Sequence, residues 1–414
     1  MKFSPQQDNA LVRADRWYRE SDKQVFHLFG YAGTGKTTLA KHLAQNIDGE
    51  VLFGAYTGKA AHVLRTKGCH NAATLHSMIY RSRDKSKERL KELENERDAL
   101  INELMKQELT PEQLSDHPKI RKLRRLIEEE AKNSSQPNFI LNHDSPVKDA
   151  SIVMIDECSM VDGQMAQDLL SFGTPVLVMG DPAQLPPVGG AGYFTENINP
   201  DIMLDEIHRQ AQESPIIRMA TKVRNQELLE LGDWGNDCFV YAKGTKLPTD
   251  QILGYDQILV GKNATRHLTN SKIRKLLDVH DKYPVIGDRL VCLRNNSELG
   301  LLNGAIFMAT SIDGVMDGKV HMTVQPEDSQ MNVSVAALEQ HFLGKGKDLN
   351  AQYWLRSEGQ EFDYGYALTV HKSQGSQWES VCVFDESGVF RDQKYRWLYT
   401  AITRAAENVS VIRM

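Results

Sequence analysis

The chain has few cysteines, no long apolar run and no excess of positive charge. Its five cysteines are scattered over 414 residues without a C-x-x-C pair. This pattern argues against a zinc site and for free thiols in a reducing compartment. No apolar run approaches the length of a membrane span, and the N-terminal residues do not begin a signal peptide. We therefore expect a cytoplasmic protein with no membrane partner.

The charge balance does not suggest a protein that binds nucleic acid with its whole surface, because the formal net charge is −6. A local basic groove remains compatible with this total, since phosphate contacts depend on the charge near them. The length allows two to four domains.

A glycine-rich stretch from Val25 to Leu39, VFHLFGYAGTGKTTL, contains the spacing G-x-x-x-x-G-K-T. An apolar, β-prone run precedes it and a helical pattern follows, which favours a P-loop for ATP over a generic glycine turn. Glycines there let backbone N–H groups close around a phosphate. The predicted nucleotide-binding residues are Gly30, Gly33, Gly35, Lys36, Thr37 and Thr38. Lys36 would reach the β- and γ-phosphates, and the Thr37 hydroxyl would hold Mg²⁺.

Two acids close a second apolar strand. The run from Ser151 to Ile155 is followed by Asp156 and Glu157, a pattern typical of a central parallel strand with acids at its carboxyl end. Beside a P-loop, we expect Asp156 to bind Mg²⁺ and Glu157 to polarise the attacking water. Gln184 follows the next apolar strand and is a candidate for orienting that water, although alone it would more often be a turn residue.

Three more residues are candidates for the nucleotide site. Arg209 and Arg404 lie outside the first P-loop unit and are candidate fingers for the γ-phosphate, with surface salt bridges as the alternative. Gln7 follows a helix start at Ser4 and Pro5. Its amide is a candidate for reading the adenine edge, and a solvated residue on the helix surface is the alternative.

Small and polar residues at the ends of α/β strands are well placed for a ligand that crosses the carboxyl edge of a sheet. Thr57, Lys59, Thr74 and His76 fall at such positions, with ordinary turn chemistry as the alternative. Asn263 follows a later strand in the same way.

Residues 83–132 form a strongly charged insert, in which 26 of 50 residues are charged, and this excludes a core role. Apolar stripes at helical spacing run from Leu90 to Leu104 and from Ile120 to Ile127. We expect an antiparallel helical hairpin that projects from the body, with low complexity or disorder as the alternative. The β-prone runs at residues 79–80 and 139–141 would pair as its stem.

A second α/β unit begins near Ser214, and between Tyr283 and Gln360 it becomes β-rich. Asn303-Gly304 and Asp317-Gly318 signal tight turns there. A small β-barrel inserted into the second unit is the economical interpretation.

Taken in order, the motifs GYAGTGKTT, AYTGKAA, TLHS, IDE, GDPAQLPPV, LDEIHRQ, YALTVHKSQGSQ and LYTAITRA resemble those of superfamily 1 helicases. TGKAA, the Gln-Leu-Pro-Pro turn and VHKSQG are similar to the RecD/Dda-like branch, superfamily 1B. The resemblance runs from about Gln7 to Arg404. It implies two RecA-like domains with ATP between them, and unwinding of duplex DNA by 5′ to 3′ movement along one strand.

The resemblance also implies roles for single residues. Gln7 matches the adenine-contacting glutamine, and Arg209 and Arg404 match two γ-phosphate arginines. The residues in motifs that contact single-stranded DNA are Thr57, Lys59, Thr74, His76, Thr369 and His371. A β-hairpin at the position of the insert is the strand-separating wedge in related helicases, which makes Tyr80 and Phe139 candidates for that contact. The chain departs from the pattern in its charged insert and in lacking a recognisable nuclease or large N-terminal domain.

The expected architecture is α/β, with two RecA-like P-loop domains, a helical and β-hairpin insert in the first and an SH3-like β-barrel in the second. The expected limits are 1–80 and 139–212 for the first domain, 81–138 for its insert, 213–283 and 361–414 for the second domain, and 284–360 for the barrel.

The expected function is an ATP- and Mg²⁺-dependent DNA helicase of replication, recombination or repair in a bacterial or phage-infected cell. We expect a monomer that acts on single-stranded DNA and duplex junctions, with a single-strand-binding protein or replisome component as a partner. The alternative is a nucleic-acid-stimulated ATPase that remodels protein–DNA complexes without unwinding. A non-enzymatic clamp or loader is disfavoured by intact Lys36, Asp156 and Glu157. RNA stays open as the track, because no residue pattern reads a 2′-hydroxyl.

Overall fold

The computed structural model describes residues 3–82, 92–101, 104, 117–134, 139–186, 192–195, 199–206, 213–296, 299–327, 329–345 and 359–414. Of Ser82, Phe139 and residues 128–134 it describes the backbone alone. Within these ranges, no helix combines the length and the apolar character that a membrane crossing requires.

The first half of the chain forms a six-stranded sheet in which all neighbouring strands are parallel. The strands are β1 (Val25–Gly30), β2 (Val51–Ala55), β3 (Ala73–Thr74), β6 (Ile152–Asp156), β7 (Val176–Gly180) and β8 (Ile202–Leu204), in the order β3-β2-β6-β7-β1-β8. The helices are α1 (Pro5–Glu20), α2 (Lys36–Ala44), α3 (Gly58–Thr66), α4 (Leu75–Ile79) and α8 (Gly163–Leu170), with 3-10 turns η1 (Pro146–Lys148) and η2 (Cys158–Met160).

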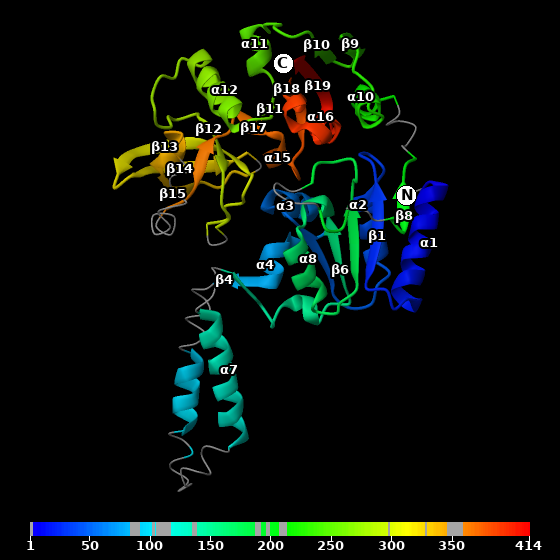
Figure 1. Ribbon diagram of the computed structural model, residues 1–414. Helices are drawn as coiled ribbons and strands as arrows, with labels where there is room; N and C mark the ends of the chain where they lie inside the picture. Colours follow the sequence, from blue (N-terminus) through cyan, green and yellow to red (C-terminus); the bar gives the residue numbers. More distant parts are fainter. Residues whose placement is uncertain are drawn as a thin grey trace.

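Helices cover both faces of this sheet (Figure 1). Side chains of α1, α2 and α3 form one apolar cluster with the sheet, and those of α4 and α8 form another on the opposite face. Double coverage buries the strands on both sides, which is why they read as continuous apolar runs in the sequence. The carboxyl ends of β1, β6 and β7 meet at one edge, because these strands are neighbours in the order β6-β7-β1.

The second half of the chain forms another six-stranded sheet. Its strands are β9 (Gly232–Gly235), β10 (Cys238–Tyr241), β11 (Gln257–Val260), β17 (Ala367–Thr369), β18 (Trp378–Asp385) and β19 (Ala405–Arg413), in the order β17-β11-β18-β19-β10-β9. Only the β9–β10 pair is antiparallel among them. The helices are α10 (Pro215–Arg224), α11 (Thr249–Leu253), α12 (Asn263–Leu276), α15 (Val370–Ser373) and α16 (Lys394–Ile402), with the 3-10 segment η4 (Ser387–Gln393). Side chains of α10 and α16 join one apolar cluster and those of α11 and α12 another.

A five-stranded antiparallel sheet interrupts this second unit. Its strands are β12 (Arg289–Cys292), β13 (Ile306–Met316), β14 (Lys319–Pro326), β15 (Val333–Leu338) and β16 (Phe362–Tyr364), in the order β15-β14-β13-β12-β16, and α13 (Glu339–Phe342) follows β15. The sheet has an apolar cluster of its own. Asp317 and Gly318 have φ of 51° and 71°, the left-handed backbone of a tight hairpin turn between β13 and β14. The turn predicted from Asp-Gly is therefore present.

A two-stranded stem leaves the first sheet. Strands β4 (Tyr80–Ser82) and β5 (Phe139–Leu141) pair antiparallel, with Tyr80 opposite Leu141. The pairing predicted for residues 79–80 with 139–141 is therefore present at Tyr80 but wrong at Ile79, which ends α4. Between them, residues 92–101 are helical and α7 (Pro118–Ser134) forms a second helix. Leu100, Ile101, Leu104 and Ile120 join these helices in a small apolar cluster. The two helices lie side by side and project from the body (Figure 1).

Candidate functional site

The loop between β1 and α2 has the backbone that a P-loop requires. Gly33 and Gly35 have φ of +77° and +81°, a region that glycine enters without strain. A Cβ on Gly30 would lie 2.7 Å from the Leu204 Cβ, so the close approach of β8 also requires glycine there. The loop leads into the N-terminus of α2, where free backbone N–H groups favour an anion.

Lys36 and Thr37 are the first two residues of α2. The Lys36 side chain lies over the P-loop, and the Thr37 side chain lies toward Asp156. The Lys36 ammonium donates to the carbonyl oxygens of Gly30 (2.7 Å) and Tyr31 (3.1 Å), and so lies over the loop. The Thr37 hydroxyl donates to Asp156 Oδ2 at 2.9 Å. A hydroxyl beside a carboxylate supplies oxygen ligands of the kind that Mg²⁺ prefers. Thr38 occupies the next position of the same helical turn.

No group of three or more His, Cys, Asp or Glu side chains in the described ranges is arranged to hold a metal ion alone. Mg²⁺ usually takes one or two protein oxygens and completes its shell with phosphate and water. The Thr37–Asp156 pair fits that mode of binding.

Glu157, Gln184 and Arg404 meet between the two parallel sheets. With its amide oriented to satisfy both neighbours, Gln184 donates to Glu157 Oε2 (3.1 Å) and accepts from Arg404 Nη2 (3.2 Å). Arg404 Nη1 lies 3.8 Å from Glu157 Oε1. Burial raises the pKa of the Glu157 carboxyl, and the Arg404 guanidinium opposes that shift. Three residues predicted to act in catalysis therefore form one cluster, with Arg404 contributed by the second unit.

Asp181 and Tyr399 form a second bridge, which sequence reasoning missed. The Tyr399 hydroxyl donates to Asp181 Oδ2 at 2.5 Å and accepts from the P-loop Ala32 N–H at 3.2 Å. Burial raises the pKa of the Asp181 carboxyl, while the charge of Lys36 lowers it. The available signal was that Asp181 directly follows the buried strand β7, much as Asp156 ends β6.

Three more contacts join the first and second units of the chain, next to the carboxyl ends of the strands of the first sheet. Leu185 donates its N–H to Thr400 Oγ1 (2.9 Å) and accepts at its carbonyl from Gln374 Nε2 (2.8 Å). The Arg224 guanidinium lies 3.6 Å from the centre of the Tyr31 ring. The candidate site is therefore the interface between the two parallel sheets.

Gln7 lies against the P-loop. It is 5% exposed, so the alternative of a solvated surface residue is wrong. Its Oε1 accepts from the Ser4 N–H, and its Nε2 donates to the Thr34 carbonyl, both at 3.0 Å. Ser4 is the helix cap and Pro5 the first helical residue, as predicted. Adenine recognition by Gln7 stays a prediction.

Several candidates for DNA contact occupy helix starts. The Thr57 and Thr74 hydroxyls cap α3 and α4, accepting from the N–H groups of Ala60 and Ser77. Turn chemistry thus accounts for part of the role of both threonines. Lys59 lies in the first turn of α3, Thr369 is the N-cap of α15, and Asn263 begins α12.

The structure brings some of the candidates for DNA contact from the first and second units close together. A Cβ on Gly375, just after α15, would lie 2.9 Å from Thr57 Oγ1, so this loop touches the start of α3. His371 lies 5.4 Å from the Phe390 ring, and His76 lies 4.9 Å from the Tyr80 ring. Burial lowers the pKa of both histidines, which favours neutral rings near pH 7.

The candidates for strand separation are only partly described. The Tyr80 hydroxyl donates to Asp168 Oδ2 on α8 at 2.5 Å, so this side chain anchors the stem to the body. That contact does not favour the predicted placement of Tyr80 against a base pair. The side chain of Phe139, and all of Arg209, lie outside the described residues.

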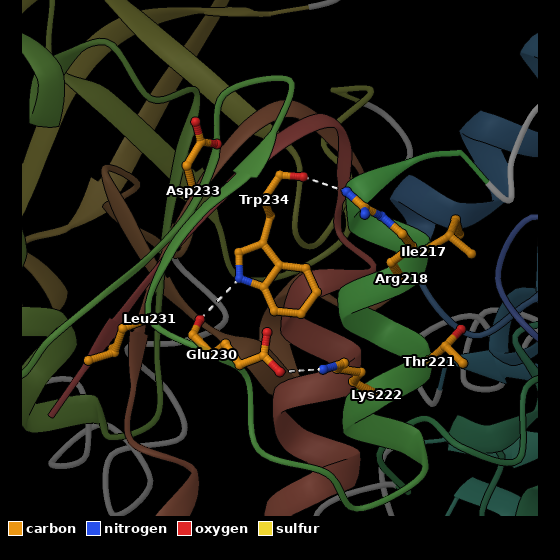
Figure 2. Close-up of a pocket in the computed structure, with 8 residues that line it drawn as sticks. All are labelled: Ile217, Arg218, Thr221, Lys222, Glu230, Leu231, Asp233 and Trp234. Atoms are coloured by element: carbon orange, nitrogen blue, oxygen red, sulfur yellow. Dashed lines mark hydrogen bonds and ion pairs between the residues drawn. The ribbon is translucent and has the colours of Figure 1, made fainter.

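A pocket of about 620 Å³ lies between α10 and the β9 strand (Figure 2). Lys222 pairs with Glu230 at 2.9 Å, and Arg218 donates to the Trp234 carbonyl. Because these cations already have partners within the pocket, its charge does not point to a ligand.

Comparison with known proteins agrees with this geometry. Residues 3–236 match the family described as AAA domain, and residues 364–412 match the UvrD-like helicase C-terminal domain. The chain is 26% identical over 402 residues to the ATP-dependent RecD2 DNA helicase of Deinococcus radiodurans, a match that covers 92% of this chain and 46% of the relative. The chain thus spans about half the length of this curated relative.

Solved structures share the fold. The crystal structure of the Pif1 helicase from Candida albicans aligns with a TM-score of 0.53 at 18% identity, covering 100% of this chain and 95% of that one. The structure of Bacteroides Pif1 bound to single-stranded DNA aligns with a TM-score of 0.53 at 16% identity, covering 99% and 92%. The glycine loop and paired parallel sheets define the class of P-loop proteins. The chain belongs to the AAA domain family, and its match to the UvrD-like helicase C-terminal domain and its RecD2 relative bear out the predicted superfamily 1, RecD-like resemblance.

Proposed function

We propose that the protein is an ATP- and Mg²⁺-dependent DNA helicase that moves 5′ to 3′ along single-stranded DNA and unwinds the duplex ahead. The cluster of Glu157, Gln184 and Arg404 is the observation that carries the proposal. It joins a base, a water-orienting amide and an arginine across two sheets, as phosphoryl transfer to water requires.

The P-loop side of the interface supplies binding. Lys36 exchanges its two backbone carbonyl partners for the β- and γ-phosphates, and the α2 N-terminus donates backbone N–H groups. Thr37 and Asp156 would hold Mg²⁺, which would neutralise phosphate charge. Gln7, already held against the P-loop, recognises the adenine edge.

Glu157 accepts a proton from the attacking water, and Gln184 orients that water. Arg404 stabilises the charge that develops on the γ-phosphate, and Arg209 is proposed as a second arginine with the same role. Activation of the water by Glu157 and charge stabilisation by Arg404 act together only at the closed interface. Arg404 belongs to the second unit, while Lys36 and Glu157 belong to the first.

Hydrolysis is coupled to movement through this interface. Loss of the γ-phosphate removes the charge that Lys36 and Arg404 share, so the units separate. Thr57, Lys59, Thr74 and His76 grip the strand from the first unit, and Asn263, Thr369 and His371 grip it from the second. Alternating grips on the sugar–phosphate backbone move the protein by about one nucleotide per cycle, without sequence preference.

The domain limits given by the sequence are proposed for the protein, supported by which strands share a sheet. The five-stranded antiparallel sheet is proposed to be the SH3-like barrel of the 1B branch. We propose a monomer that acts on single strands and junctions in replication, recombination or repair, with a single-strand-binding protein or replisome component as its partner.

Strand displacement tests the proposal. A duplex with a 5′ single-stranded tail should be unwound with ATP, and a duplex with a 3′ tail should not. Displacement from the 3′ tail alone would reverse the polarity. ATPase activity stimulated by single strands, with no displacement from either tail, would favour the alternative of a remodelling ATPase that does not unwind.

A further inference from the structure

Helix α10 of the second unit lies against the P-loop of the first. The Arg224 Cζ, near the end of α10, lies 3.6 Å from the centre of the Tyr31 ring. A Cβ on Gly33 would lie 3.6 Å from Ile217 Cδ1, so this part of the loop is also next to α10. Ile217 and Arg224 are seven residues apart, which places them on the same face of α10, roughly 10 Å apart along its axis. One face of α10 therefore contacts the first half of the P-loop.

Helix α16 of the second unit reaches the same part of the loop. The Tyr399 hydroxyl accepts from the Ala32 N–H at 3.2 Å. Burial and the Asp181 carboxylate raise the pKa of this hydroxyl, and the charge of Arg224 opposes that rise. The Arg224 guanidinium is therefore close to the Tyr399 hydroxyl as well as to the Tyr31 ring. Each of the three consecutive loop positions 31, 32 and 33 thus has a contact from the second unit.

The Tyr31 backbone helps to shape the P-loop. Its carbonyl oxygen accepts from Thr34 Oγ1 at 2.8 Å and from the Lys36 ammonium at 3.1 Å. Its N–H donates to the Leu204 carbonyl at 3.2 Å. When Lys36 moves to the phosphates, the Tyr31 carbonyl loses one of its donors. The contact between the Tyr31 ring and Arg224 does not involve Lys36, so it can hold the loop while ATP is bound.

We propose that Arg224 is a positioning residue for ATP hydrolysis, which stacks on Tyr31 and holds the P-loop in place while the two units are closed. This inference deepens the function proposed above and rests on it. A guanidinium suits this role because it is planar, always charged and stacks on aromatic faces. Since Arg224 belongs to the second unit, the contact forms when the units close and is lost when they separate.

The test is a double-variant cycle on Arg224→Met and Tyr31→Leu, measured as ATPase kcat and KM with single-stranded DNA present. Methionine keeps an apolar stem without the charge, and leucine keeps an apolar side chain without the aromatic face. A cation–π contact corresponds to roughly a 2- to 30-fold change in rate, so each variant should lower kcat by a factor in this range. The KM for ATP should change little. The double variant should be no slower than the slower single variant, because both substitutions remove the same contact.

Conservative variants separate this contact from an effect on folding. Tyr31→Phe keeps the ring face and should retain more of kcat than Tyr31→Leu. Arg224→Lys keeps the charge without the planar stacking and should lie between the wild-type protein and Arg224→Met. The φ of Tyr31 is not positive, so substitution there does not strain the loop.

Arg218→Met is the matched control on the same helix. Arg218 is roughly 120° around α10 from Arg224 and donates to the Trp234 carbonyl, away from the P-loop. This variant removes the same charge and should leave kcat and KM unchanged.

Unchanged kcat in both single variants would overturn the proposal, and so would a double variant whose loss equals the product of the two single losses. A higher KM with unchanged kcat would also overturn it, and would assign Arg224 to direct binding of the nucleotide. A wild-type protein that hydrolyses ATP but displaces no strand would overturn the helicase function alone. A wild-type protein that does not hydrolyse ATP would overturn both.

Discussion

Glu157 combines a left-handed backbone with a largely buried carboxylate in the site. Its backbone is left-handed, with φ 52° and ψ 43°, and its carboxylate lies between Gln184 and Arg404. A non-glycine residue in this region costs of order 1–3 kcal/mol and is kept where the surroundings require it. Here the turn points the Glu157 carboxylate at the second unit, while Asp156 points at Thr37. Two adjacent acids are thus separated into two roles.

Replacing Glu157 with glutamine should preserve nucleotide binding and lower ATP hydrolysis by about 10²-fold or more, because the amide keeps the shape but cannot accept a proton. Steady-state ATPase rates and binding of a fluorescent ATP analogue measure the two quantities. If nucleotide binding is lost instead, Glu157 is structural or a metal ligand.

The Tyr399 hydroxyl joins the second unit to Asp181 and Ala32 of the first. Tyr399→Phe deprives buried Asp181 of a donor and the Ala32 N–H of an acceptor. We expect a lower kcat with little change in the KM for ATP, and a loss of roughly 1.5–3 kcal/mol in the free energy of unfolding. Tyr395→Phe, on the same helix, is the matched control. Equal behaviour of both variants would show that the bridge between Tyr399 and Asp181 has no part in turnover.

Among the elements, the stem and the two helices of the insert follow from local sequence. Tyr80 pairs with the run 139–141 as the β-prone pattern predicts, whereas Ile79 ends α4 and the first stem strand continues to Ser82. The direction of the Tyr80 side chain did not follow. Its partner Asp168 is 88 residues away on α8, and no local pattern encodes that contact. The β-prone pattern therefore predicts the stem but not how it is anchored.

Replacing residues 83–136 with a short turn should leave ATPase stimulation by single strands nearly intact and sharply reduce unwinding. The stem ends, Ser82 and Phe139, already pair, so the shortened chain keeps its register. Stopped-flow strand displacement measures the effect. Unwinding of a tailed duplex at the wild-type rate would exclude the insert from the separating machinery.

On the scale of the whole molecule, the interface between the two sheets was only partly predictable. The P-loop, Asp156 and Glu157 were identifiable because each lies at or just after the end of a buried strand in one continuous segment. Arg404 was identified from its motif, but its contact with Gln184 joins residues 220 positions apart in the sequence. The Tyr399–Asp181 bridge had no motif that linked its halves, and it was missed. Strand order within each sheet likewise depends on pairing that local periodicity does not encode.

Arg404→Ala and Arg209→Ala should each reduce kcat for ATP far more than they weaken ATP binding. Arginine fingers contribute roughly 10³–10⁵ in rate where they act alone, and two that share a phosphate give less each. The double variant should therefore be sub-additive. Full additivity, with unchanged stimulation by single strands, would show that one of the two arginines does not act on the γ-phosphate.

The paired stem has a consequence for how this chain can change over evolution. Because Tyr80 and Leu141 lie opposite each other, the chain leaves and re-enters the first unit at neighbouring points. Anything inserted there closes a loop whose entropic cost grows by only about 0.6 kcal/mol for each doubling of length. The stem is thus an insertion site. Inserted segments of different length and charge can be exchanged there while the two sheets and their interface stay the same. Divergence of the insert alone would then leave both sheets and the interface between them unchanged.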